Sequence, residues 1–246
     1  MKITKVKQIA VVADIHANKY ALTKFLNYIE IELKVDYILN LGDFLQIGPH
    51  PKEVTEIILS DDRFINILGN NEIVITKKLN IETCKEEVQH RKWTEKHLGS
   101  VLLEKIQKIP TSRVLEINNM KIFMVHSRQL DNQFQNVWDL PLLYQGKPLD
   151  DFIKDYPDNA EIILFGHTHE QLYLNRKNKI FVNPGSLGCS ILPSTISFCI
   201  IETNTNGWNF LFKNLKYDES KLKSDYIRLK VPDRKFILNN FYGIDI

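Results

Sequence analysis

Cysteine is scarce in this sequence of 246 residues, which contains only Cys84, Cys189 and Cys199. Their odd number and the lack of metal-ligand spacing argue against a disulfide framework, so we expect reduced, structural thiols. Long hydrophobic runs are absent too. The apolar stretch after the basic N-terminus, residues 9–13, ends at Asp14 and is too short for a signal sequence or a membrane span. We therefore expect a cytoplasmic protein with no membrane partner.

An excess of charge of one sign is also absent. Lysine and arginine total 32 against 30 for aspartate and glutamate, so the formal net charge is +2. This balance gives no electrostatic argument for a membrane or nucleic-acid partner, and it weighs against nucleic acid as a substrate. Internal repeats and low-complexity segments are missing, and the length suits one core. We expect a single domain over residues 1–246 and leave its oligomeric state open.

Strand-like apolar runs alternate with helical patterns in the N-terminal part of the chain. Residues 19–33 carry apolar side chains at helical spacing, and residues 51–60 begin with a proline that suits a helix N-terminus. This alternation predicts parallel strands joined by right-handed crossovers. The strands predicted here are 9–13, 37–41 and 64–68.

The order changes in the second half, where predicted strands follow one another through short turns. Asn118-Asn119 and Asn206-Gly207 are hairpin signals, so antiparallel pairs and mixed sheets are expected. A helical insertion at about 84–108 is predicted to break at Gly99-Ser100, and a helical tail over 217–243 to divide at Pro232. The strands predicted in this half are 113–117, 121–125, 161–165, 179–183, 196–201 and 208–215.

Residues that can bind a metal follow five of the predicted strands. In α/β sheets the carboxyl ends of strands share one crevice, so residues far apart in sequence are predicted to meet there. Imidazole, carboxylate and amide donors without a thiolate favour Mn, Fe, Ni, Co or Zn over Ca. The residues are Asp14 and His16 after 9–13, Asp43 after 37–41, Asn70 after 64–68, His126 after 121–125, and His167 and His169 after 161–165.

The order Asp-x-His, Gly-Asp, Gly-Asn-x-Glu, His and Gly-His-x-His resembles the calcineurin-like metallophosphoesterases. The resemblance covers most of the chain and includes the segments DIHANKYAL, GDFLQIGPHPKEV and VNPGSLG. It implies an α/β fold, a four-layer αββα sandwich of two mixed β-sheets flanked by helices. It also implies a centre of two divalent metal ions and hydrolysis of phosphate esters.

The resemblance assigns the ligands of each ion. One ion would be bound by Asp14, His16, Asp43 and His169, and the other by Asp43, Asn70, His126 and His167. Asp43 would bridge them, since a carboxylate can hold two cations about 3.5–4 Å apart. A metal-bridging hydroxide would then attack phosphorus in line, and Mn is the metal we expect. The resemblance assigns catalytic roles to Asp43, Asn70, Asn71 and His126.

Position 71 departs from the family pattern. Many members have a histidine after Gly-Asn, whereas Asn71 can bind substrate by a hydrogen bond but cannot supply a proton. General acid help contributes about 10²–10⁴-fold, so a slow enzyme, a preference for good leaving groups, or a substitute acid is expected. His50, in the loop that follows Asp43, is the candidate substitute; the alternative is an exposed loop histidine.

Two other residues are candidates for binding substrate. Asn18 is placed to contact the phosphate or, alternatively, to cap the helix predicted from residue 19. Arg128 is placed to bind a substrate anion or to lie at the surface beside the site.

The leading functional hypothesis is a metal-dependent phosphodiesterase or phosphatase acting on a small molecule. A phosphatase for phosphoproteins or dinucleoside polyphosphates is the alternative enzyme. A non-catalytic scaffold that binds protein partners is the alternative outside enzymes, and the change at Asn71 is its motivation. The intact set of metal ligands weighs against the scaffold, because unpaired buried carboxylates and imidazoles would be costly there.

Overall fold

The computed structural model describes residues 1–78, 84–127, 156–204 and 207–245. Its first half builds three parallel strands joined by helices, as the sequence predicts: β2 pairs with β3, and β3 with β4. Apolar residues of the helices face the sheet at helical spacing, as Leu22, Phe25 and Ile29 do. These elements are β2 (Gln8–Val12), α1 (Lys19–Glu32), β3 (Tyr37–Asn40), α2 (Pro51–Ser60) and β4 (Phe64–Asn66).

A long antiparallel pair completes this sheet. β10 (Thr195–Asn204) pairs with β11 (Gly207–Lys216) and, on its other side, with β2. The five strands lie in the order β11-β10-β2-β3-β4, so the sheet is mixed. The antiparallel pairing agrees with the predicted hairpin, whose turn residue Asn206 lies outside the described residues.

A second mixed sheet has six strands in the order β1-β5-β6-β7-β9-β8. The predicted hairpin at Asn118 and Asn119 joins β5 to β6, and both residues have positive φ, of 49° and 66°. β8 and the short β1 are absent from the sequence prediction. The strands are β1 (Lys2–Ile3), β5 (Ser112–Ile117), β6 (Met120–Val125), β7 (Ile162–Leu164), β8 (Gln171–Arg176) and β9 (Lys179–Pro184).

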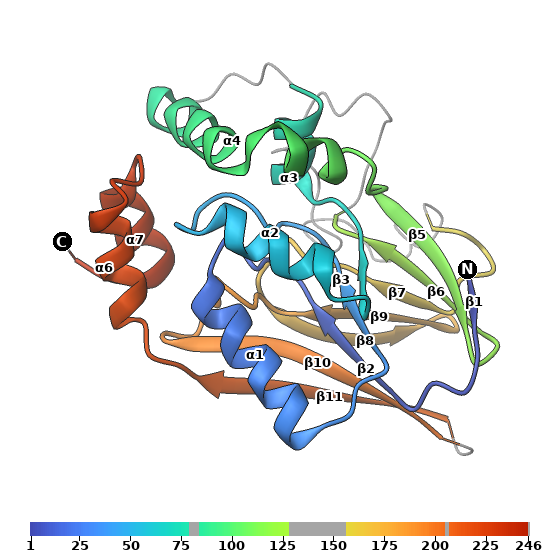
Figure 1. Cartoon of the computed structure of the whole chain (residues 1–246). Helices are drawn as coiled ribbons and strands as arrows, with labels where there is room; N and C mark the ends of the chain where they lie inside the picture. Colours follow the sequence, from blue (N-terminus) through green and yellow to red (C-terminus); the bar gives the residue numbers. More distant parts are fainter. Residues whose placement is uncertain (79–83, 128–155, 205–206, 246) are drawn as a thin grey trace.

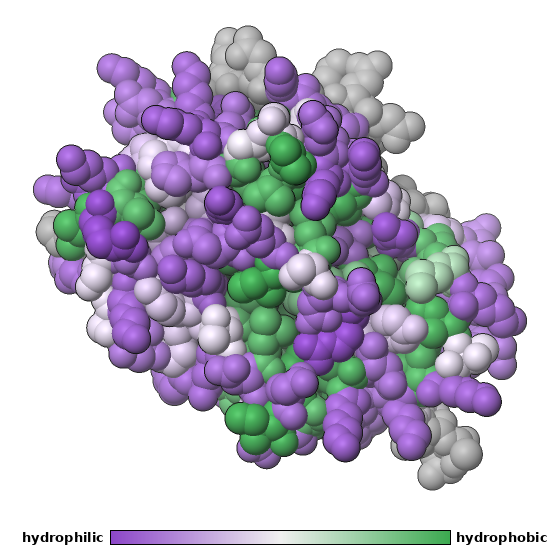
Figure 2. All heavy atoms as spheres, in the orientation of Figure 1, coloured by the Kyte–Doolittle hydropathy of each residue, from purple (hydrophilic) through white to green (hydrophobic). Residues whose placement is uncertain are grey.

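The main apolar core lies between the two sheets. Val11 and Leu39 of one sheet and Ile122 of the other belong to a single cluster of buried side chains. A second cluster fills the space between the five-stranded sheet and helices α1 and α2, which cover its outer face (Figure 1). Figure 2 shows this helical side of the molecule as mainly hydrophilic, with hydrophobic residues gathered near its middle. The architecture is the α/β sandwich of two mixed sheets that the resemblance implies.

The remaining helices lie toward one end of the sandwich (Figure 1). Gly99, with φ of 70° and ψ of 168°, interrupts the longest of them, at the position where the sequence predicts a break. Gly243 ends the last helix in the left-handed conformation typical of a helix C-terminus. No helix in the described part of the chain is both long and apolar enough to cross a membrane. These helices are α3 (Asn70–Thr76), α4 (Lys85–Ile106), α6 (Ser220–Arg228) and α7 (Arg234–Tyr242).

A buried carboxylate attaches α6 to the rest of the protein. Oδ2 of Asp225 accepts hydrogen bonds from the Tyr20 hydroxyl at 2.6 Å and from His50 Nε2 at 2.8 Å, while Arg228 pairs with Oδ1. Asp225→Ala leaves buried donors without an acceptor, so we expect it to lower the free energy of unfolding by about 3 kcal/mol. Chemical denaturation measures this. The exposed Asp218→Ala is the control, and equal losses in both variants would contradict the expectation.

Candidate metal centre

The loops that follow five strands meet at one end of the sandwich. Asp14 N donates to Gly42 O at 3.0 Å, and His16 N donates to Asp43 O at 3.0 Å, which ties the loop after β2 to the loop after β3. Gly166 N donates to His126 O at 2.9 Å, which ties the loop after β7 to the end of β6. These bonds hold the loops of each sheet together, and His167 N, which donates to the carboxylate of Asp14, joins the loops of one sheet to those of the other.

Two groups of candidate ligands form there, and each has ligand atoms within 4.8 Å of one another. They divide the four histidines as the resemblance does, whereas Asp43 belongs to one group only. Asp43 is in the second group, and Asn70 lies against it because its Oδ1 is 3.0 Å from His167 Nδ1. The first group is Asp14, His16 and His169, and the second is Asp43, His126 and His167.

The two groups are close to each other. His126 Nε2 lies 3.3 Å from Asp43 Oδ2 in its own group and 3.9 Å from Asp14 Oδ1 in the other. In the first group, His169 Nε2 is 3.6 Å from Asp14 Oδ1 and 3.0 Å from His16 Nε2. All the carboxylates and imidazoles named here are buried or nearly so.

Three of the histidines are oriented in the same way. The Nδ1 atoms of His16, His126 and His169 lie 3.3, 2.8 and 2.9 Å from backbone carbonyl oxygens. A proton on Nδ1 that is donated to a carbonyl leaves Nε2 as a bare acceptor, which is the form that binds metal. Nε2 of His126 has no hydrogen-bond partner although it is buried, and Nε2 of His16 faces Nε2 of His169. These orphaned acceptors fit divalent cations.

The backbone of the candidate ligands is strained. Asp14, His16, Asp43, His167 and His169 all have positive φ, between 47° and 73°. Residues other than glycine seldom adopt this region, and such strain concentrates at functional sites where the surroundings enforce it. The fold therefore holds these side chains against a local conformational cost.

Two glycines allow the close approach of these loops. A Cβ at Gly166 would lie 3.0 Å from Asp14 Oδ2 and 3.3 Å from His126 Nδ1, and 2.8 Å from the Ala13 side chain. A Cβ at Gly69 would overlap the carboxylate and backbone of Asp43. The Gly-His and Gly-Asn pairs of the sequence thus have a steric cause.

Burial determines the protonation of the site. It raises the pKa of Asp14 to about 8, and it lowers the pKa of His16 and of His167 to about 4 and that of His169 to about 3. Burial opposes charge on His126 as well, but Asp43 and Asp14 outweigh it and raise its pKa to about 10. The neutral imidazoles of His16, His167 and His169 are suited to bind a cation, and a bound cation would displace the proton that His126 otherwise carries.

Glu72 supports the loop that carries Asp43. Its carboxylate accepts hydrogen bonds of 2.8 Å from the backbone N–H groups of Asp43, Leu45 and Gly69. Glu72 therefore holds the loops after β3 and β4 together from beneath the ligands, and its side chain is fully buried.

Glu72→Gln is expected to weaken Mn²⁺ binding by about 10–100-fold, because an amide nitrogen would face backbone donors and displace the ligand loop. Calorimetric titration with Mn²⁺ measures the change. Glu56→Gln, an isosteric change on the exposed side of α2, is the control. Unchanged affinity in Glu72→Gln would show that the loop keeps its position without the carboxylate.

The other predicted site residues have different positions. Asn71 lines the cavity at the site, but its backbone N and its Nδ2 donate to the two oxygens of Asp43, at 2.9 and 2.6 Å. Asn18 is buried and caps α1, with Oδ1 accepting from Ala21 N, while Nδ2 donates to Gly188 O. Of its two interpretations, the helix cap is the one observed. Arg128 lies outside the described residues.

The interpretation of His50 as an exposed loop histidine is wrong. Its side chain is fully buried at the start of α2, where Nε2 bonds to Asp225. It does not line the cavity that contains the candidate ligands, because the loop after β3 turns it toward α6.

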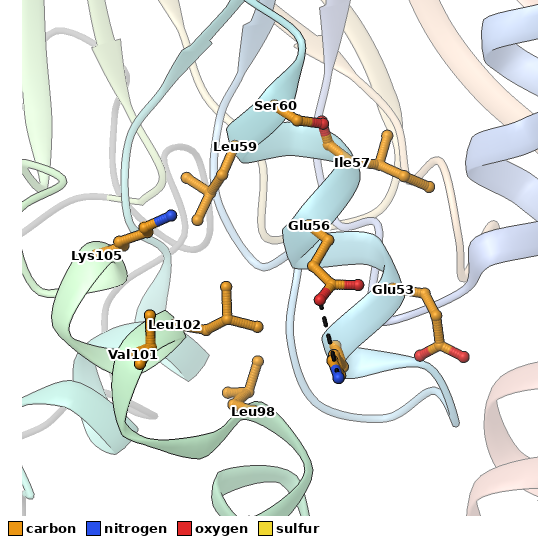
Figure 3. Close-up of a pocket in the computed structure, with 10 residues that line it drawn as sticks. Glu53, Glu56, Ile57, Leu59, Ser60, Leu98, Val101, Leu102 and Lys105 are labelled. Atoms are coloured by element: carbon orange, nitrogen blue, oxygen red, sulfur yellow. Dashed lines mark hydrogen bonds and ion pairs between the residues drawn. The ribbon is translucent and has the colours of Figure 1, made fainter.

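The candidate ligands open into a cavity of about 560 Å³. Sequence reasoning missed most of its far side, which comes from α4, α7 and the segment around Ile191. In the sequence, His90 lies three residues before Trp93 and seven before His97 in the helix expected at about 84–108, so the three share a face that allows either a wall over the site or packing into the core. A larger cavity of about 690 Å³ lies between α2 and α4 (Figure 3) and contains none of the candidate ligands. Leucines and charged surface residues line this larger cavity. The cavity that contains the candidate ligands is therefore the candidate active site.

The fold and this cluster define a metal-dependent phosphoesterase. Residues 8–206 match the model of the calcineurin-like phosphoesterase superfamily domain, and the chain belongs to this superfamily. An uncharacterized protein of Methanocaldococcus jannaschii is 24% identical over 245 residues, which cover 92% of this chain and 94% of that protein.

Solved structures share the fold. A metallophosphoesterase from Sphaerobacter thermophilus has a TM-score of 0.77 at 18% identity and covers 98% of this chain and 100% of its own. A hypothetical protein from Pyrococcus horikoshii OT3 has a TM-score of 0.75 at 21% identity, over 100% of both chains. A putative diadenosine tetraphosphatase has a TM-score of 0.56 at 13% identity, covering 87% of this chain and 97% of its own.

Proposed function

We propose that the protein hydrolyses phosphate esters of small molecules at two divalent ions, with Mn²⁺ as the preferred metal. The observation that carries this proposal is the set of buried imidazole nitrogens and carboxylate oxygens that gather in two groups, with His126 Nε2 buried and without a hydrogen-bond partner among the described residues. When bound, such ions supply Lewis-acid polarisation of the phosphoryl group and activation of water. The absence of thiolates from both groups suits Mn²⁺ and the neighbouring transition metals.

The residues of the chain have distinct parts in this proposal. Asp14, His16 and His169 would hold one ion, and Asn70, His126 and His167 the other, with Asp43 shared between them. Asn71 positions Asp43 through its two hydrogen bonds. The side-chain amide of Asn71 cannot protonate a leaving group, and one of its two N–H donors is engaged with Asp43. We therefore expect faster hydrolysis of aryl esters, whose leaving groups need no proton, than of alkyl esters.

The test uses purified protein freed of metal by a chelator and then loaded with Mn²⁺. Hydrolysis of bis(4-nitrophenyl) phosphate and of 4-nitrophenyl phosphate reports diester and monoester activity separately. Turnover that appears with Mn²⁺ and disappears with the chelator supports the proposal. Tight binding of Mn²⁺ without turnover of either ester would favour the protein-binding scaffold. The only reason to consider this scaffold is that asparagine occupies position 71.

A dinucleoside polyphosphate is the alternative substrate, because one structural neighbour carries the name of a putative diadenosine tetraphosphatase. The charges of the cavity weigh against it. None of the described residues that line it is lysine or arginine, whereas several phosphates in a row require cations along their length. A small substrate with one phosphoryl group fits better, in the cytoplasm, which is where we place the protein.

A further inference from the structure

One wall of the cavity has no part in the metal centre. We call it the α4–α7 wall, because two helices provide it. Its side chains line the same cavity as the candidate ligands. The α4–α7 wall consists of Glu87, His90, Asp233, Phe236, Ile237 and Phe241.

The wall is apolar at its centre, and its aromatic rings are accessible. Phe236 is 55% exposed and Phe241 is 37% exposed, and their ring centroids lie 6.3 Å apart. Ile191 lines the same cavity and is 62% exposed. Large apolar side chains grouped at a concave surface, next to polar residues, are typical of a ligand-binding pocket.

The wall carries negative charge. The half-buried carboxylates of Glu87 and Asp233 line the cavity. Burial raises the pKa of Glu87, while the positive charge of Arg91 lowers it. Asp233 also raises it, because the two carboxylates repel each other. Burial likewise raises the pKa of Asp233, with a contribution from Glu86. An anionic group bound beside them would be repelled, and a cationic group would be attracted.

His90 adds a neutral surface to the same wall. The side chain is only 5% exposed, and burial lowers its pKa to about 4, so the imidazole is uncharged near pH 7. Its Nε2 is enclosed by the protein and lies out of reach of a ligand. His90 therefore does not offset the negative charge of Glu87 and Asp233.

We propose that the α4–α7 wall binds the alcohol part of the substrate, and that this part is an apolar group bearing an ammonium nitrogen. The inference rests on the proposed function, because the metal centre fixes where the phosphoryl group lies. The rings of Phe236 and Phe241 contact the apolar body, with cation–π attraction to the nitrogen. Glu87 and Asp233 balance its charge. The wall thus selects esters with a single phosphoryl group and a cationic alcohol part.

Four phosphonates test this inference without depending on turnover: methylphosphonate, benzylphosphonate, 4-(aminomethyl)benzylphosphonate and 4-carboxybenzylphosphonate. Calorimetric titration of the Mn²⁺-loaded protein at low salt gives a dissociation constant for each. Burial of the ring predicts that benzylphosphonate binds about thirtyfold more tightly than methylphosphonate. The aminomethyl compound should bind more tightly still, and the carboxybenzyl compound about tenfold or more weaker than the aminomethyl compound.

Variants of the wall assign each preference to a residue. Phe236→Ala should reduce the advantage of the benzyl ring to about threefold, and Ile227→Ala, an exposed apolar residue on α6, should leave it unchanged. Asp233→Asn should reduce the preference for the amine, and asparagine tolerates the positive φ of 59° at this position.

The outcomes separate this inference from the proposed function. Affinities that differ by less than threefold among the ring compounds, or tightest binding of the carboxybenzyl compound, would overturn the inference. The same preferences in the wild-type protein and in all wall variants would also overturn it. If none of the phosphonates binds while bis(4-nitrophenyl) phosphate is hydrolysed, the inference fails and the proposed function stands. If the esters are not hydrolysed either, both fail.

Discussion

Asp43→Asn is expected to lower kcat/KM for bis(4-nitrophenyl) phosphate by roughly a thousandfold. The carboxylate lies 3.3 Å from His126 Nε2 and accepts hydrogen bonds from Asn71 to both oxygens, so it connects the second group with the loop after β4. An amide keeps the shape but removes the negative charge that offsets the cations. Steady-state kinetics with saturating Mn²⁺ gives the ratio, and atomic absorption of the dialysed protein should show that metal is lost.

The control for this prediction is Asp62→Asn, the same chemical change at an exposed position after α2. It should leave kcat/KM within twofold of the wild-type value, on the order of the experimental scatter. Full activity and full metal content in Asp43→Asn would show that Asp43 is not shared between the two ions.

Metal removal is expected to lower the melting temperature by about 5–10 °C. Without cations, the buried carboxylates of Asp14 and Asp43 face each other, and the pKa of Asp14 rises to about 8 because burial and Asp43 both disfavour its charge. Cations that bind only the folded protein stabilise it by mass action. Calorimetric melts in chelator, and then in Mn²⁺ at about a hundred times its dissociation constant, measure the difference.

The same melts of His126→Ala provide the control. Because His126 Nε2 is the buried acceptor without a hydrogen bond, its loss should remove most of the stabilisation by Mn²⁺ while the melting temperature in chelator changes less. An equal shift by Mn²⁺ in wild type and variant would place the bound ions outside the cluster.

The positions of the candidate ligands could be predicted from the sequence because one physical rule governs them. Loops after the parallel strands β2, β3 and β4 open at the same edge of their sheet, so Asp14, Asp43 and Asn70 had to lie near one another. The helical spacing of apolar residues in α1 and α2 predicted the helices that connect these parallel strands. The sequence prediction extended the same rule to His126 and His167, but these residues follow strands of the second sheet, and only the resemblance implied how the two sheets are placed.

Other features had weaker local signals. β8 was missed because its turn to β9, Lys177-Asn178, contains no glycine, although both residues adopt positive φ. α3 was not predicted because it begins at Asn70, and the residues Gly69, Asn70 and Asn71 are typical of a turn. Its start is stabilised by Glu72, which accepts from the backbone of Gly69.

The α4–α7 wall depends on contacts between helices far apart in the chain. The pattern of residues 84–108 allows the helix face that carries His90 to form either a substrate wall or part of a core, and it does not decide between the two. Likewise, the burial of His50 requires Asp225, a partner 175 positions away. The local sequence around such side chains is compatible with several environments. Packing against residues far apart in the chain therefore determines which environment each side chain has.

Anomalous diffraction at the manganese edge from crystals soaked in Mn²⁺ would locate the bound ions. We expect two peaks about 3.5–4 Å apart, one beside Asp14, His16 and His169 and the other beside His126 and His167, with Asp43 between them. A single peak, or peaks away from these side chains, would contradict this expectation.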